Sequence, residues 1–276
     1  MKEKVWSAMS RIVLLIWALA ILFPMFWIVY ESFKSNREFF ADIWALPEKL
    51  QFSNYLRAWD NLNVGRSFLN TLCYVGGSLA LGLVVTTLGA YAFTRLKWRG
   101  RKFFWTMLMI SLFLPGINVL VPQYTIMQSL GLLNKLSGLV LLAGLPMSAF
   151  GIMLLGSFMS SIPTALEDSA MIDGATLFQI FRKIIVPLSV PGIVTVAIFN
   201  FVTLYNDFIG PFIMITDPDK YPISVNMYSA NAMMQYKADW VALLAGVVLT
   251  ILPTIVIYIL FQKQIMEGAT VGGVKG

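Results

Sequence analysis

Long apolar blocks separated by polar segments dominate the chain. A block of about 17–25 apolar residues is long enough for an α-helix to cross the hydrocarbon core of a bilayer. This pattern predicts an all-α membrane protein with six transmembrane helices. We expect the spans at about residues 12–30, 68–93, 103–121, 136–158, 191–215 and 240–261, within a single transmembrane domain of residues 1–276.

The second predicted span carries small residues along one side. Ser78, Gly82, Thr86 and Ala90 follow one another at intervals of four residues. Small residues on one ridge allow two helix backbones to approach each other closely. We therefore expect this ridge to pack against another helix of the bundle.

The polar segment 159–190 is longer than the roughly 2–8 residues that a connection between helices needs. Pro163 is typical of a helix start and Gly174 of a helix end. A second helical stretch, Leu177–Val186, is expected to end at Pro187. The pattern predicts a short helix outside the membrane, between the fourth and fifth spans.

That short helix needs a surface to cover its apolar residues. Leu166, Met171 and Ile172 are too few to form a core of their own. A helix resting on lipid headgroups is one alternative, but the ionic residues of the segment before Arg182 are all acidic, which suits an anionic membrane surface poorly. We favour a protein partner.

Charge sets the expected orientation. Of the 276 residues 58% are apolar and 12% charged, with a net charge of +6. A dense basic cluster lies between the second and third predicted spans. Its members are Arg95, Lys97, Arg99, Arg101 and Lys102. Because loops rich in Lys and Arg stay in the cytoplasm, both termini and the segment 159–190 are expected on the cytoplasmic side.

The composition excludes several function classes. The sequence has no histidine and one cysteine, Cys73, which leaves no histidine metal site, Ser-His dyad or disulfide framework. Gly268 and Gly273 have the spacing of a phosphate-binding loop, but Val274 stands where that loop requires lysine. We expect no catalytic residue, no metal site and no nucleotide cofactor in this chain, and no nucleic-acid partner.

Asp207 is the one acid placed well inside a predicted span, and intramembrane carboxylates usually mark functional sites. It either lines a translocation path or forms structural hydrogen bonds at a helix end. Other polar residues on or near interrupted spans are candidates for the same path, although each also fits ordinary packing or an interface position. They are Asn118, Gln123, Tyr124, Asn200, Tyr205 and Asn206.

One run in the segment 159–190 resembles the EAA loop of bacterial ABC importer permeases, which reads E-A-A, three residues, G, nine residues, then I-x-L-P. The run is Asp168-Ser169-Ala170-Met171-Ile172-Asp173-Gly174-Ala175, followed by Ile184-Ile185-Val186-Pro187. It departs from the pattern at Asp168, Ser169 and Val186. This version looks like the carbohydrate-uptake branch that includes the maltose permease subunits.

Two further motifs extend the resemblance. Phe199-Asn200-Phe201, Tyr205-Asn206-Asp207-Phe208 and Pro211 are similar to the F-N, W-N-D-F and P element of that branch, with Tyr205 in place of tryptophan. The tail Gly268–Gly276 is similar to that of the shorter, maltose-G-like subunits. By resemblance, its Gly272, Gly273 and Lys275 would contact the ATPases.

The resemblance implies a permease subunit of an ATP-driven, binding-protein-dependent importer for a sugar or oligosaccharide, in a bacterial or archaeal cell membrane. Its implied partners are a second homologous permease, two cytoplasmic ATPase subunits that bind the ATP and Mg, an extracytoplasmic sugar-binding protein and membrane lipids. The ATPase-coupling residues would be Glu167, Asp168, Ser169, Ala170, Asp173, Gly174, Ala175 and Pro187. The alternative is an ion-coupled secondary transporter of a small polar solute.

Overall fold

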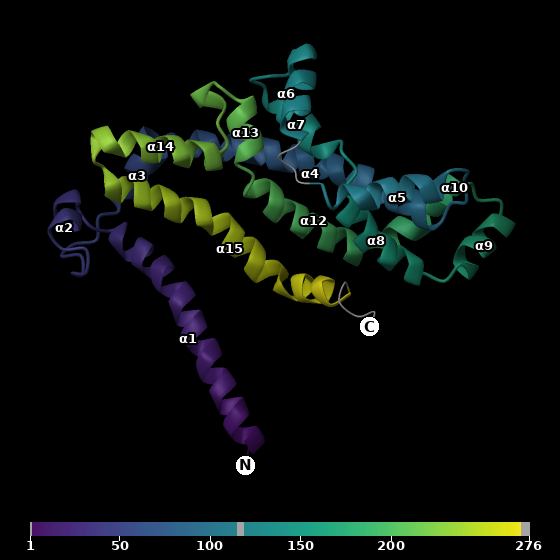
Figure 1. Ribbon diagram of the computed structural model, residues 1–276, viewed down its shortest axis with the longest axis horizontal. Coiled ribbons are helices and arrows are strands. Elements are labelled where there is room, and N and C mark those ends of the chain that lie inside the picture. The colour runs from purple at the N-terminus through teal and green to yellow at the C-terminus, as the bar shows by residue number, and fades with distance from the viewer. Residues whose placement is uncertain (1, 115–118, 272–276) are drawn as a thin grey trace. The chain divides into compact units, whose positions relative to one another are not determined.

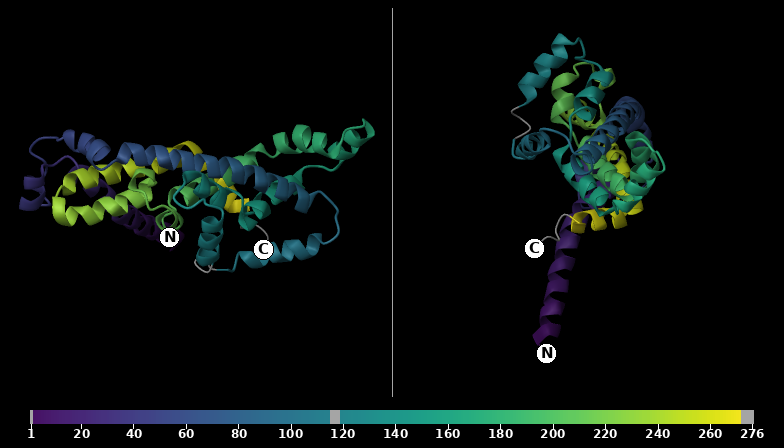
Figure 2. Two further views of the ribbon diagram at one scale, coloured as in Figure 1. Left: turned by 90° about the horizontal axis from the view of Figure 1, so that it is seen from above. Right: turned by 90° about the vertical axis from the view of Figure 1, so that its right-hand side faces the viewer.

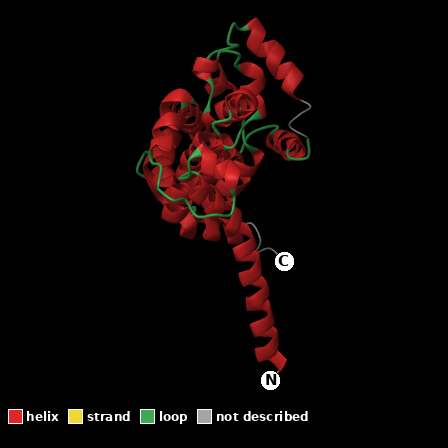
Figure 3. Cartoon of the chain, turned by 90° about the vertical axis from the view of Figure 1, so that its left-hand side faces the viewer, coloured by secondary structure: helices red, strands yellow, loops and turns green. Residues whose placement is uncertain are grey.

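A computed structural model describes residues 2–114 and 119–271, and over these ranges the chain is built from helices and loops without a strand (Figures 1 and 3). The chain divides into two compact units, residues 1–66 with 226–253 and residues 67–225 with 254–276. This division concerns packing and leaves the prediction of one functional domain untested.

The first unit begins with the long apolar helix α1. Its helices are α1 (Lys2–Glu31), α2 (Asn36–Ala41), α3 (Ser53–Asn61), most of α14 (Ile223–Lys237) and the first part of α15 (Trp240–Val271). Every described side chain of α1 before Glu31 is exposed or half-buried, although most of them are apolar. Such a surface is stable in a bilayer, where lipid tails cover it.

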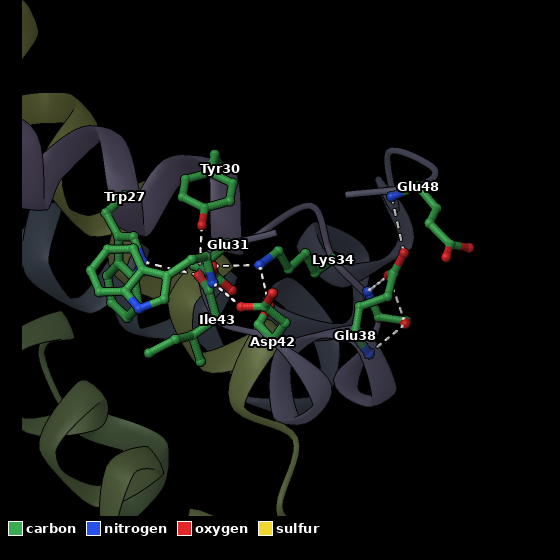
Figure 4. Close-up of polar contacts among 10 residues, drawn as sticks. Trp27, Tyr30, Glu31, Lys34, Glu38, Asp42, Ile43 and Glu48 are labelled. Atoms are coloured by element: carbon green, nitrogen blue, oxygen red, sulfur yellow. Dashed lines mark hydrogen bonds and ion pairs between the residues drawn. The ribbon is translucent and has the colours of Figure 1, made fainter. Parts of the chain in front are cut away.

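A buried ion pair closes the end of α1 (Figure 4). The Nζ atom of Lys34 lies 2.6 Å from Oε1 of Glu31, and both side chains are fully buried. Lys34 also donates to the carbonyl of Asp42 at 3.0 Å. The amide of Asn54 on α3 donates to the backbone carbonyls of Ser32 and Lys34 at 2.7 and 2.8 Å. These bonds hold the chain leaving α1 against α3.

The second unit packs around one hydrophobic core. Its helices are most of α4 (Val64–Thr94), α5 (Arg101–Ser111), α6 (Leu120–Ser129), α7 (Leu136–Gly144), α8 (Ala149–Ser161), α9 (Ala165–Ile172), α10 (Leu177–Ile180), a π-helix (Phe181–Ile185), α11 (Val186–Leu188), α12 (Val190–Tyr205), α13 (Ile209–Met214), a 3-10 helix (Pro218–Lys220) and the later part of α15. The core combines Ala90 of α4, Ile152 and Leu155 of α8, and Val196 of α12, all at most 1% exposed.

The small-residue ridge predicted on the second span lies in this packed region. Ser78, Thr86 and Ala90 are at most 1% exposed. A Cβ atom built on Gly144 of α7 would lie 3.0 Å from the carbonyl oxygen of Ser78. The backbones of α4 and α7 therefore approach closely at small residues, as the spacing predicted.

Three described helices are long and apolar enough to cross a membrane, namely Met9–Glu31, Val64–Thr94 and Trp240–Gln264. Two bent pairs bring the number to five if each counts as one span. They are α7 with α8, bent by 53°, and residues 177–188 with α12, bent by 73°. The count of six spans stays a prediction.

Three predicted spans are interrupted in the described structure. The span expected at 136–158 is divided, because α7 ends at Gly144 and α8 begins at Ala149. The span expected at 103–121 is divided, because α5 ends at Ser111 and α6 begins at Leu120. The span expected at 191–215 stops at Tyr205, and a separate helix, α13, follows. Prolines explain part of the pattern, since a proline lacks the N–H that a continuous helix uses; Pro146 lies at the bend between α7 and α8.

Candidate functional site

The segment 159–190 folds into the short helix that its sequence predicts. Helix α9 begins two residues after Pro163, at Ala165, and ends at Ile172, with Asp173 as the capping residue. Gly174 has a φ of +81°, in the left-handed region that favours glycine, and no atom lies within 4 Å of an added Cβ. The N–H of Ala175 then donates to the carbonyl of Ala170 at 2.9 Å, which closes the helix end.

The second half of this segment is less regular than predicted. Thr176 caps α10 through a reciprocal pair of hydrogen bonds with Gln179. The expected single helix Leu177–Val186 is instead α10, a π-helical turn and α11, and Pro187 lies within α11 rather than after a helix end. A proline cannot donate a backbone hydrogen bond, which interrupts the regular ladder here. π-Helices are rare and occur mostly as single turns within α-helical segments, as in this one.

The predicted coupling residues divide between two faces of the segment. Asp168, Ser169, Asp173 and Gly174 are exposed, and Pro187 is exposed further along. Ala170 and Ala175 are half-buried and pack against the hydrophobic core of the second unit. Beside the exposed acids lie the apolar side chains that are too few to form a core of their own. Leu166 and Met171 are about half exposed, and Ile172 is 87% exposed.

Glu167 lies on the protein side and has an ion-pair partner that the sequence did not indicate. Its Oε1 lies 3.0 Å from Nη1 of Arg95, with side chains 13% and 7% exposed respectively. The Nη2 atom of Arg95 donates to the carbonyls of Met159 and Ile162 at the end of α8. From the sequence, Arg95 was only one member of a basic cluster, because nothing local marks a partner on another helix.

A cavity of about 330 Å³ lies among α4, α6, α7 and α13. Asp207 lines it from the break between α12 and α13, rather than from inside a continuous span. The phenol of Tyr74 donates to Oδ2 of Asp207 at 2.7 Å, and the N–H of Gly210 lies 3.4 Å from Oδ1. Gln123 is the second predicted path residue on the wall. The carboxylate thus forms hydrogen bonds at a helix break and also lines a cavity; a role in a translocation path stays a prediction.

The other path candidates do not line this cavity. Tyr205 is buried, Asn200 is half-buried and Tyr124 is 38% exposed. Asn206 is exposed, and its amide donates to the Val202 carbonyl of its own helix at 2.8 Å. Asn118, Gly272, Gly273 and Lys275 lie outside the described residues.

Tyr74 is the site residue that sequence reasoning missed. It is 2% exposed, on α4, and reaches Asp207 from a distant part of the chain. A tyrosine in the middle of an apolar span was the available signal, because a buried phenol usually finds a hydrogen-bond partner.

Comparison with known proteins gives a consistent result. Residues 78–264 match the family described as "Binding-protein-dependent transport system inner membrane component". The chain is 32% identical to the diacetylchitobiose uptake system permease protein NgcG of Streptomyces coelicolor, over 98% of this chain and 89% of the relative. It is 31% identical to the galactooligosaccharides transport system permease protein GanQ of Bacillus subtilis, over 97% of this chain and 95% of the relative.

A solved structure has the same fold. In the crystal structure of a bacterial ABC transporter involved in the import of the acidic polysaccharide alginate, one chain matches with a TM-score of 0.84. The sequence identity is 24%, and the match covers 95% of this chain and 97% of that one. At this identity the likeness speaks for the fold alone.

Proposed function

This chain belongs to the family of binding-protein-dependent transport system inner membrane components, and from that premise we propose that it carries a sugar or oligosaccharide inward across a bacterial or archaeal cell membrane. The observation that carries the proposal is the folded segment 159–190, which presents an exposed acidic and apolar face while its other face is fixed to the bundle. The carbohydrate substrates named for the relatives NgcG and GanQ support the substrate class.

Helix α9 is the proposed contact to a cytoplasmic ATPase. The exposed carboxylates of Asp168 and Asp173 suit a partner groove with basic groups, and the 87% exposed side chain of Ile172 would be covered there. ATP and Mg are bound by two such ATPase subunits. When these close on each other, α9 moves as a rigid body and the bundle opens toward the other side of the membrane.

The orientation follows from the basic residues between α4 and α5. Lys97, Arg99 and Lys102 are exposed directly beside an apolar helix. By the positive-inside rule this side faces the cytoplasm, together with both termini and the segment 159–190. An extracytoplasmic sugar-binding protein then delivers the substrate from the opposite side, and a second homologous permease completes the pathway.

The cavity at Asp207 is the proposed part of the sugar path within this chain. Its volume of about 330 Å³ lies at the lower end of the range for small-molecule sites, roughly 300–1,000 Å³. The carboxylate of Asp207 and the amide of Gln123 offer acceptors and donors for hydroxyl groups. The ion-coupled secondary transporter receives no support, because the family transports with a binding protein.

A pull-down with activity assays tests the proposal. The tagged chain, purified in mild detergent, is compared with Ile172→Asp and with the matched control Leu56→Asp, an exposed leucine of α3. We expect an ATPase to co-purify with the wild type and the control but not with Ile172→Asp, and deletion of the binding protein to abolish uptake of labelled oligosaccharide. The proposal would be overturned if the wild-type chain purified without an ATPase and transported the oligosaccharide without ATP.

A further inference from the structure

The last turn of α4 contacts both halves of the segment 159–190. Arg95 directly follows α4, and its N–H donates to the carbonyl of Tyr91 at 2.9 Å, so the helical spacing of the two residues continues to this position. Arg95 pairs with Glu167 of α9. The ring of Tyr91 lies 5.0 Å from the ring of Phe181, in the π-helical turn. One helix end therefore holds the segment at two separate points.

The contact at Arg95 joins three elements. Besides the carboxylate of Glu167, its guanidinium binds the carbonyls of Met159 and Ile162, where α8 ends. The carbonyl of Met159 also accepts from the N–H of Ile162 at 3.2 Å, and the last carbonyls of a helix carry the negative end of its dipole. A buried planar guanidinium with several donors suits such a set of acceptors, which a lysine ammonium would bind less completely.

The opposite part of the same helix contacts the cavity. Tyr74 donates to Asp207 from a position about 30 Å along the helix axis from Arg95, at about 1.5 Å per residue. Between these two residues α4 has no proline and no break, and Figure 2 shows it as one long continuous helix. The other routes from the segment are bent, by 53° between α7 and α8 and by 73° before α12.

We infer that α4 is the rigid element that transmits the movement of the coupling segment to the cavity, with Arg95 as the positioning residue at its C-terminal end and the Tyr74–Asp207 hydrogen bond in its N-terminal half. The inference rests on the proposed function, since it names the internal route by which that function is coupled. A rigid element with side-chain contacts at both sites gives them a direct physical connection. Arg95 does not line the cavity; it acts through Glu167 and the end of α8.

The test uses the reconstituted complex of all subunits at saturating liganded binding protein. Arg95→Met is compared with Arg99→Met, an exposed member of the same basic cluster. We expect Arg95→Met to retain the co-purifying ATPase and its basal hydrolysis, but to lose about tenfold in the ratio of stimulated to basal hydrolysis, a usual size for coupling between sites. Arg99→Met should keep the wild-type ratio, and Arg95→Lys should lie between the two.

Two double variants separate transmission from a merely structural role. The double variant Arg95→Met with Glu167→Gln should lose no more stimulation of ATP hydrolysis than Arg95→Met alone. Each substitution removes the same contact, so the second has nothing further to remove. The loss of stimulation in Arg95→Met with Tyr74→Phe should also be smaller than the sum of the two single losses. Both substitutions interrupt the same connection through α4. If Arg95→Met fails to fold, Glu167→Gln, which keeps an acceptor oxygen, replaces it in the comparison with Tyr74→Phe.

Two outcomes would overturn the role of α4. One is that Arg95→Met binds the ATPase and keeps the wild-type ratio of stimulated to basal hydrolysis. The other is that the losses from Arg95→Met and Tyr74→Phe add fully. The proposed function fails differently, since the wild-type chain itself would then bind no ATPase.

Discussion

Among the described residues, two ion pairs have largely buried side chains, and they bridge very different distances along the sequence. Glu31 and Lys34 are three residues apart and fix a single segment at the end of α1. Arg95 and Glu167 lie on separate elements and join the end of α4 to α9. Burial makes each pair costly to break, but only the second links two separate helical elements. We therefore expect the first to govern stability and the second to govern coupling.

The largest expected effect is on stability, from breaking the local pair. Lys34→Met leaves the fully buried carboxylate of Glu31 without its partner, which costs about 3–5 kcal/mol for a buried pair. Thermal unfolding of the purified protein in detergent measures the loss, with the exposed Lys49→Met as the control. Uptake per folded molecule should stay unchanged. If Lys34→Met instead lowered the stimulation of ATP hydrolysis, the two ion pairs would not differ in role.

A smaller loss of stability is expected from Asn54→Ala. Its buried amide donates to two backbone carbonyls, of Ser32 and Lys34, and these acceptors would lose their partner at a cost of about 1–3 kcal/mol. The exposed Asn61→Ala at the end of the same helix is the control. Equal unfolding temperatures for the two variants would show that the local pair holds this segment without help from α3.

The coupling segment should tolerate less change at its turn than its exposure suggests. Gly174→Ala forces a side chain into the left-handed region, at a cost of about 1–2 kcal/mol, although no atom lies near the added Cβ. Gly76→Ala, also in open space but within α4, should be neutral or stabilise the protein. Hydrogen exchange of residues 165–176 should rise only in Gly174→Ala; unchanged exchange there would mean that the turn conformation does not hold the segment.

The smallest effect is a pH dependence confined to the segment after α1. Hydrogen bonds from the backbone N–H and hydroxyl of Ser35, and from the N–H of Glu48, lower the pKa of Glu38 below its ordinary value of 4.5. A lowered carboxyl pKa contributes stability above the unfolded-state value, and this stability is lost as the pH falls through the folded-state pKa. The unfolding temperatures of wild type and Glu38→Gln should therefore differ near neutral pH and converge below about pH 4. If the difference in unfolding temperature persisted at acidic pH, it would arise from the altered side-chain packing of Glu38→Gln and not from the loss of the carboxylate charge.

The sequence by itself determined the local features of this protein. Apolar block length predicts the long helices α1, α4 and α15, because a helix in lipid must satisfy its own backbone and present an apolar surface. The sequence also predicted the turn at Gly174 and the small-residue ridge from Ser78 to Ala90, because each depends on residues close together in the chain. The motif around Asp168 indicated the family for the same reason.

Tertiary structure alone decided which distant residues meet. The pairing of Arg95 with Glu167, the hydrogen bond from Tyr74 to Asp207 and the division of the predicted third span between α5 and α6 all depend on how helices pack. Helical periodicity states which face a residue occupies, but it does not state which helix lies opposite that face. A basic cluster and a tyrosine within an apolar span therefore look ordinary in the sequence, and Arg95 and Tyr74 acquire their distant partners only once the bundle has formed.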